Sequence, residues 1–311
     1  MDLVIPTPRK APRSARGKLG HFVDDVGYDG FAHYLEVYRA AMAELPPFDA
    51  QFDVPTSFGT VRVYRFGPEV AAPPVVLLPG RNASTPTWRV NLPPLLAGRT
   101  LYCVDLLGEA GMSVQHAPLT GAADQARWLD EALAGLGLRS AHLAGMSIGG
   151  WTVTNLAVHR PGRVASLTLL DPVQTFARIP VKTLLVSAAM FSASVPESLR
   201  RRVFSWIGGG APVDESAPEA ALISAGATDF VIRSAMPKRF TDEQLRSLSM
   251  PVLAFIAGRS VMLDATRAAA RARTLLPRGQ VEPWENASHA INGEYPGEIA
   301  ERAHRFWAEV D

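Results

Sequence analysis

The sequence has little of what small secreted domains and metal centres depend on. Its 311 residues include a single cysteine, so no intrachain disulfide is possible. Cys103 lies inside an apolar run over residues 100–104, which is typical of a buried structural thiol. The seven histidines are not paired at ligand spacing and no cysteine cluster exists, so we expect no metal site.

The chain also lacks an excess of charge and long hydrophobic runs. Its 31 Lys and Arg residues nearly balance 30 Asp and Glu residues, which argues against a nucleic-acid partner. No run reaches the ~18 apolar residues of a membrane span, and the first residues do not resemble a signal peptide. We therefore expect a cytoplasmic protein, whose oligomeric state the sequence does not indicate.

Two further motifs are missing or weak. No Gly-x-Gly-x-x-Gly follows the first expected sheet strand, so we expect no dinucleotide and no other cofactor. The N-terminal segment is basic but interrupted by prolines, which favours a disordered, solvated arm over a basic helix. Its basic residues are Arg9, Lys10, Arg13, Arg16 and Lys18.

What the sequence does have is a regular alternation of strand-like and helix-like segments. A helical apolar spacing covers residues 27–44, and alternating patterns before and after Phe58-Gly59 indicate an antiparallel hairpin. Continuous apolar runs follow, separated by amphipathic segments such as 122–136; these runs cover residues 74–78, 101–104, 141–144, 164–170 and 252–256. This order predicts an α/β fold: a mostly parallel central sheet with helices on both faces.

The alternation stops between Asp171 and Pro251. Helical patterns over 179–191, 196–207 and 218–236 predict an inserted helical cap without strands. We therefore divide the chain into an N-terminal arm and helix (1–48), a first core part (49–171), the cap (172–240) and a second core part (241–311).

One pentapeptide has the pattern of a catalytic motif. Gly145-Met146-Ser147-Ile148-Gly149 stands between an expected strand and an expected helix, as in a nucleophile elbow. Any Cβ at the glycines would crowd so sharp a turn. The strained turn exposes the serine hydroxyl above the carboxyl ends of the strands. The following helix directs its N-terminal N–H groups at the same point.

A serine hydroxyl needs a base, and His289 is the best placed of the histidines. It lies in a loop after the strand-like residues 280–284 and before the last helix. Ligands of parallel sheets bind beyond the carboxyl ends of the strands, so this loop can reach Ser147.

With these motifs the chain resembles the α/β-hydrolase superfamily over roughly residues 50–311. Leu77-Leu78-Pro79-Gly80-Arg81 resembles the oxyanion loop, although Pro79 replaces the usual histidine. The segment from Asp105 to Ser113 resembles another family loop, and His289 is followed by Glu294 and Pro296 as in the family's terminal segment. The resemblance implies an oxyanion hole formed by the backbone N–H groups of Arg81 and Ile148.

The acid that orients His289 is open between two residues. The usual family position, three residues past Gly258, is Val261, which cannot fill the role. Asp171, in a Leu-Asp-Pro segment like that of pancreatic-type lipases, is the preferred candidate. Asp264 is the alternative, although its place before 265–270 is typical of a helix N-cap.

The sequence thus predicts a serine esterase acting on small or medium apolar esters through Ser147, His289 and Asp171. Trp151, Phe176 and Phe191 are expected in the substrate pocket. The same constellation would serve a thioesterase, lactonase, C–C hydrolase or acyltransferase. A catalytically silent binding protein of the same fold is the alternative from a different class.

Overall fold

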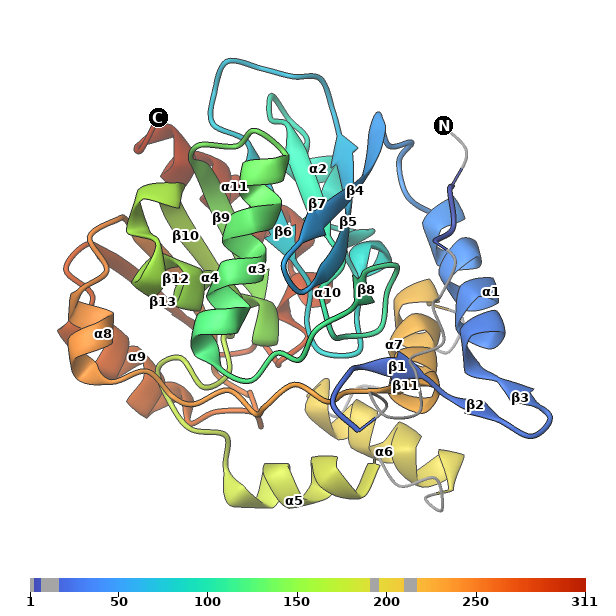
Figure 1. The fold of residues 1–311 in the computed structure, drawn as a ribbon. Helices are drawn as coiled ribbons and strands as arrows, with labels where there is room; N and C mark the ends of the chain where they lie inside the picture. Colours follow the sequence, from blue (N-terminus) through green and yellow to red (C-terminus); the bar gives the residue numbers. More distant parts are fainter. Residues whose placement is uncertain (1–2, 7–16, 191–195, 210–216) are drawn as a thin grey trace.

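The computed structural model describes residues 3–6, 17–190, 196–209 and 217–311. A central sheet runs through the molecule with helices on both faces (Figure 1). The strands are ordered β13-β12-β10-β9-β6-β7-β5-β4, and β8 pairs with β5. Their bounds are β4 Ala50–Thr56, β5 Gly59–Phe66, β6 Val75–Leu78, β7 Leu101–Val104, β8 Val114–Gln115, β9 Ala141–Met146, β10 Val164–Leu170, β12 Val252–Ala257 and β13 Gly279–Trp284.

The predicted fold class is confirmed. β6, β7, β9, β10, β12 and β13 are parallel to their neighbours in that set, whereas β4, β5 and β8 pair antiparallel. Every residue of β6 and β9 is buried, because helices cover both faces of these central strands. That is why their sequences are continuous apolar runs rather than alternating ones.

Side chains of successive strand residues enter two separate cores, one on each face of the sheet. Val76 and Leu78 belong to the core that also includes buried residues of α3 (Ala122–Gly135), α4 (Ile148–His159) and α9 (Ala265–Leu275). Val75 and Leu77 belong to the core that also includes buried residues of α1 (Gly30–Ala43), α2 (Leu92–Leu95) and α11 (Pro296–Ala308). This is the period-2 alternation expected of a strand covered on both sides.

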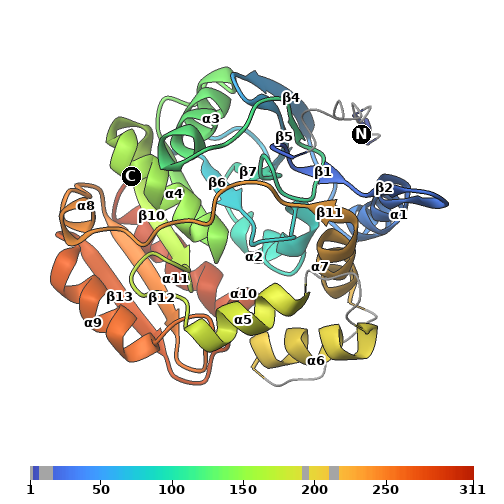
Figure 2. The ribbon, with the colours of Figure 1, turned by 60° about the horizontal axis from the view of Figure 1, so that its bottom comes forward.

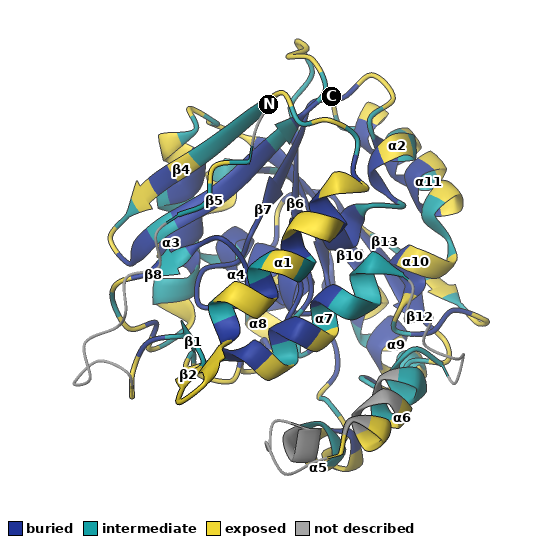
Figure 3. Ribbon diagram, turned by 90° about the vertical axis from the view of Figure 1, so that its right-hand side faces the viewer, coloured by how far each residue is buried: buried dark blue, intermediate teal, exposed yellow. Residues whose placement is uncertain are grey.

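The segment between β10 and β12 forms α5 (Val181–Met190), α6 (Glu197–Ile207), α7 (Pro218–Asp229) and α8 (Asp242–Arg246). Seen from two directions, α5 and α6 lie at one end of the molecule, outside the layers around the sheet (Figures 1 and 3). Within the described ranges, no helix is both long and apolar enough to cross a bilayer.

Our prediction of a strand-free segment with a helix over 218–236 is wrong. The helix ends at Asp229, and β11 (Phe230–Val231) pairs antiparallel with β1 (His21–Phe22). Phe230 and Val231 are aromatic and β-branched, and the rings of Phe22 and Phe230 meet at 4.9 Å. The pairing depends on a partner about 200 residues away in sequence, which no local pattern reveals.

The start of α1 is held by β2, β3 and the end of α7. Residues 28 and 29, expected in the helix, form β3 (Tyr28–Asp29), which pairs with β2 (Asp24–Asp25). Asp29 then caps α1 by accepting the N–H of Ala32. Asp229, buried at the end of α7, accepts hydrogen bonds from the Tyr28 hydroxyl and from His33 Nδ1. The N-terminal segment and residues 217–231 are therefore joined by both a strand pair and side-chain bonds. The predicted basic arm lies mostly outside the described residues.

His142, the second residue of β9, is fully buried beside α11. Its Nδ1 lies 2.8 Å from Ser166 Oγ and its Nε2 2.9 Å from Asp311 Oδ1. Asp311 is held in turn by Arg99, at 2.6 Å. Burial lowers the pKa of His142, and the bond to Asp311 only partly opposes this.

A lowered histidine pKa makes stability depend on pH in one direction. The unfolded chain takes up a proton near the ordinary pKa of ~6.5, whereas the folded chain resists it. The stability that His142 contributes is therefore full above pH ~6.5 and is lost as the pH falls below it. We expect the difference in unfolding free energy between wild type and His142→Gln, measured in urea, to shrink from pH 8 to pH 5. A difference that is constant or grows over this range would contradict the assignment.

Candidate active site

Ser147 occupies the turn between β9 and α4 in a strained backbone conformation, with φ of 53° and ψ of −116°. Only glycine fits beside it. A Cβ at Gly145 would stand 2.4 Å from the backbone of Gly149, and one at Gly149 would stand 2.3 Å from the carbonyl oxygen of Leu78. The turn is thus packed on both sides by backbone, which fixes Ser147 at the carboxyl end of the central strands.

The imidazole of His289 joins Ser147 to Asp171. His289 Nε2 lies 2.9 Å from Ser147 Oγ, and His289 Nδ1 lies 2.6 Å from Asp171 Oδ2. With the carboxylate accepting the Nδ1 proton, Nε2 is the nitrogen free to accept the proton of the serine hydroxyl. The described fold therefore brings the three predicted residues together in hydrogen-bonding order, across 142 and 118 positions of sequence.

Asp171 is fully buried and held by three donors. It follows β10 with φ of 41°, an unusual value for a residue other than glycine. Besides His289, the Ala257 N–H donates to Oδ1 at 3.1 Å and the Ser260 hydroxyl to Oδ2 at 2.6 Å. The sequence reasoning missed Ser260. Its signal is a small hydroxyl residue just past the end of β12, near the position where the family usually carries its acid.

Asp264, the alternative acid, forms its hydrogen bond with the backbone at the start of α9. It is the N-cap of α9, accepting the Arg267 N–H at 3.0 Å, and its side chain is 48% exposed. Val261 stands at the usual family position of the acid. Its carbonyl oxygen accepts a hydrogen bond from the Thr183 hydroxyl of α5.

The loop that carries His289 is braced from both sides. Glu294, in the short helix α10 (Ile291–Glu294), accepts the N–H and the hydroxyl of Ser288, both at 2.7 Å. On the other side, Arg259 donates its backbone N–H to the carbonyl of Ala287 and its guanidinium to the carbonyl of Gly209. Gly209 lies just after α6, so this bond connects the chain beyond α6 to the loop between β12 and α9, which in turn holds the histidine loop. Figure 2 shows α5 and α6 in the lower part of the molecule.

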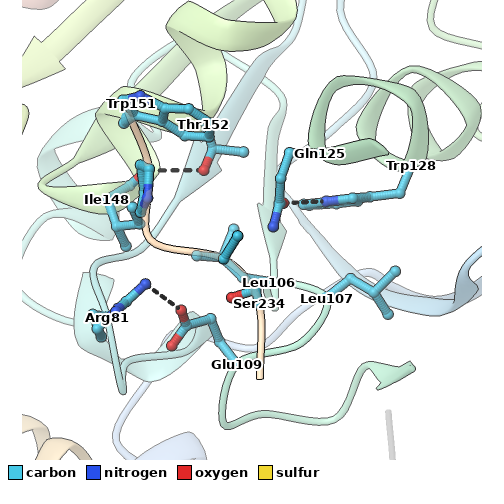
Figure 4. Close-up of a pocket in the computed structure, with 12 residues that line it drawn as sticks. Arg81, Leu106, Leu107, Glu109, Gln125, Trp128, Ile148, Trp151, Thr152 and Ser234 are labelled. Atoms are coloured by element: carbon cyan, nitrogen blue, oxygen red, sulfur yellow. Dashed lines mark hydrogen bonds and ion pairs between the residues drawn. The ribbon is translucent and has the colours of Figure 1, made fainter. Parts of the chain in front are cut away.

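The two expected oxyanion donors lie on segments in van der Waals contact. A Cβ on Gly80 would stand 3.7 Å from Ser147 Cβ, which puts the residue before Arg81 directly against the serine. Ile148 is the first residue of α4. Arg81 and Ile148 line the same pocket, and the guanidinium of Arg81 forms an ion pair with buried Glu109 (Figure 4).

This pocket is narrow and mixed in character. Its walls include Leu106, Leu107, Gln125, Trp128, Trp151, Thr152, Ser234, Ala235 and Pro237. Its volume of about 20 Å³ has room for roughly one water molecule, and its lining includes Arg81 and Ile148 but not Ser147 or His289. Trp151 is one wall, fixed by stacking on Phe240 and by donating Nε1–H to the carbonyl of Lys238.

The structure describes one of the other two residues expected in the substrate pocket. Phe176 is buried in the core cluster that includes Trp151, and it is not among the residues lining the pocket. Phe191 lies outside the described residues. Within the described ranges, no group of three or more His, Cys, Asp or Glu side chains is arranged to hold a metal ion.

Comparison with known proteins agrees with this architecture. A family model described as the alpha/beta hydrolase fold matches residues 73–294. The chain is 28% identical over 279 residues to carboxylesterase YbfK of Bacillus subtilis, covering 88% of this chain and 93% of that protein. It is 27% identical over 281 residues to the uncharacterized carboxylesterase nap of the same organism, covering 90% and 93%.

Solved structures give the same result. The crystal structure of carboxylesterase CesB (YbfK) from Bacillus subtilis superposes with a TM-score of 0.82 at 27% identity, covering 90% of this chain and 98% of that one. Naproxen esterase from Bacillus subtilis also gives 0.82, at 26% identity, covering 90% and 99%. The family model covers more than half of the sequence and the folds superpose over nearly all of it; this chain belongs to the alpha/beta hydrolase fold family.

Proposed function

We propose that this protein is a carboxylic ester hydrolase that uses Ser147 as nucleophile, His289 as general base and Asp171 as the residue that orients the base. The observation that carries the proposal is the hydrogen-bonded series Ser147 Oγ, His289 and Asp171 Oδ2, at 2.9 and 2.6 Å. A serine is a weak nucleophile by itself, and an oriented imidazole at this distance is the standard means of activating it.

The reaction follows from the positions of these groups. Ser147 Oγ attacks the ester carbonyl carbon while His289 Nε2 takes the hydroxyl proton, and the carbonyl oxygen becomes an oxyanion. The backbone N–H groups of Arg81 and Ile148 stabilise that charge, each such donor being worth about 3 kcal/mol. The intermediate then collapses, and His289 gives its proton to the departing alkoxide. Water, deprotonated by His289, attacks the acyl-enzyme and releases the acid and free Ser147.

The relatives support the reaction class. Proteins named carboxylesterases match about nine-tenths of this chain in sequence and in fold. We propose small or medium apolar carboxylic esters as substrates and no nucleic-acid partner. The aromatic and aliphatic side chains in the pocket wall, which include Trp151 and Ile148, favour an apolar group next to the scissile bond.

We further propose that residues 172–240 act as a cap over the site. Three of the pocket-lining residues, Ser234, Ala235 and Pro237, belong to this segment and close one side of the pocket. The bond from Arg259 to Gly209 ties the same segment to the loop beside His289. Movement of residues 234–237 would widen the pocket without disturbing the sheet.

The nucleophile can be tested directly. A fluorophosphonate probe reacts with activated serines, so it should label the wild-type protein and fail to label Ser147→Ala. Wild type should also turn over a p-nitrophenyl ester, with Ser147→Ala lowering kcat by about 10⁶-fold or to background. Equal labelling of both proteins would show that another residue is the activated nucleophile.

The role of Asp171 as the orienting acid can be tested with Asp264 as a matched control. Asp171→Asn keeps the shape but favours the wrong histidine tautomer, so kcat should fall by about 10⁴-fold with little change in KM. Asp264→Asn replaces an exposed cap with one of equal strength, so kcat should stay within about twofold of wild type. Steady-state kinetics on one ester decide between them, and the reverse pattern would assign the role to Asp264.

A further inference from the structure

Glu109 is a buried carboxylate next to the candidate oxyanion hole. It lies in the loop that follows β7, and its side chain is only 6% exposed. Glu109 Oε1 lies 3.3 Å from Arg81 Nη2, and Oε2 accepts the backbone N–H of Asn82 at 3.4 Å. One carboxylate therefore contacts the side chain of residue 81 and the backbone of residue 82. Figure 4 shows the ion pair on the wall of the pocket that Ile148 also lines.

Burying a charged carboxylate in this place costs free energy. Burial raises the pKa of Glu109, and the nearby Arg81 guanidinium and Asn82 N–H oppose that rise. Replacing both partners of such an ion pair by apolar groups of similar size is often neutral for stability, whereas removing one partner alone is costly. Its position therefore calls for an explanation beyond packing.

The backbone that Glu109 contacts is strained. Asn82 has φ of 55°, in the left-handed region that residues other than glycine seldom occupy. Strain of this kind persists only when surrounding contacts hold it. Arg81, whose N–H is one of the two oxyanion donors, is the residue directly before that turn. A change at Asn82 would turn the peptide between Arg81 and Asn82, which directly follows the peptide that carries the donor.

The loop that carries Glu109 is itself fixed. Asp105, fully buried, accepts the N–H and the hydroxyl of Thr85, the hydroxyl of Tyr38 and the N–H of Met112. Residues 105–112 and 81–85 are thus tied together at two places, by Asp105 at Thr85 and by Glu109 at Arg81 and Asn82. A fixed loop gives Glu109 a rigid point from which to hold the strained turn.

We propose that Glu109 is a positioning residue for the oxyanion hole: through the Arg81 guanidinium and the Asn82 N–H it holds the Arg81 backbone donor in place. The inference rests on the proposed ester hydrolysis at Ser147. It adds a residue outside the triad, and it gives the Arg81 side chain a structural task separate from that of its backbone.

The test is Glu109→Gln, measured by kcat, KM and the affinity for a trifluoromethyl ketone that forms a tetrahedral adduct with serine. A misplaced oxyanion donor weakens binding of the tetrahedral state more than binding of the ester. We expect kcat and the affinity for the ketone to fall together by tenfold or more, with KM within about threefold. The matched control is Glu301→Gln, which breaks an exposed ion pair with Arg305 on α11 and should change none of these values.

A double-mutant cycle tests whether Glu109 acts through Arg81. Arg81→Met removes the guanidinium but leaves the backbone N–H, and it should lower kcat much as Glu109→Gln does. If the two act through one contact, the double variant should be no worse than the more damaging single variant. If Glu109→Gln does not fold, Glu109→Asp takes its place, since its shorter side chain cannot span both partners; the same loss is expected.

Three results would overturn the inference: a folded Glu109 variant with kcat within twofold of wild type, a loss confined to KM, or single-variant losses that multiply in the double variant. Each would leave the proposed ester hydrolysis standing, because the wild type would still turn over ester. A wild type without turnover or probe labelling would instead remove the proposed function, and the positioning role with it.

Discussion

A single imidazole connects the two parts of the core on either side of the inserted segment. His289 contacts Ser147, which follows β9, and Asp171, which follows β10, and its own loop follows β13. A buried carboxylate such as Asp171 is tolerated only when its oxygens find donors, and here the backbone of Ala257, the hydroxyl of Ser260 and the imidazole supply them. The proposed chemistry and the stability of this corner of the fold thus depend on the same hydrogen bonds.

The backbone around this chain of bonds leaves little freedom. The contact of Gly149 with Leu78 brings the oxyanion loop against the start of α4, so the geometry of one donor constrains the other. Glu109 adds a side-chain restraint to this backbone restraint. The proposed oxyanion hole is therefore set by the packing of three loops at the carboxyl ends of β6, β7 and β9, and Ser234, Ala235 and Pro237 line the pocket beside it.

Much of this could be predicted from the sequence because its signals are local. Apolar runs such as those of β9 and β10 are long enough to identify buried strands, and the glycines at 145 and 149 mark a turn without room for side chains. The pairing of β11 with β1 could not be predicted in this way. A strand of two residues is too short to show an alternating pattern, and its partner lies far along the chain.

The choice between acids was open for the same reason. Asp171 and Asp264 each stand where a turn or a cap would place an aspartate, and only the fold shows which one faces the imidazole. Ser260 and Glu109 were missed as contributors because a lone serine or glutamate in a loop has no distinctive neighbours in sequence. Their importance comes from what the fold brings to them: the carboxylate of Asp171 for one, and the strained turn at Asn82 for the other.

The central claim is that Ser147 forms a covalent bond with the acyl group during turnover. The most direct measurement is peptide mass spectrometry of the protein after acid quenching during hydrolysis of a p-nitrophenyl ester. The account predicts that the peptide containing Ser147 gains the mass of the acyl group, in a time-dependent fraction that disappears when the ester is exhausted. Turnover with the acyl mass on a different residue would contradict it.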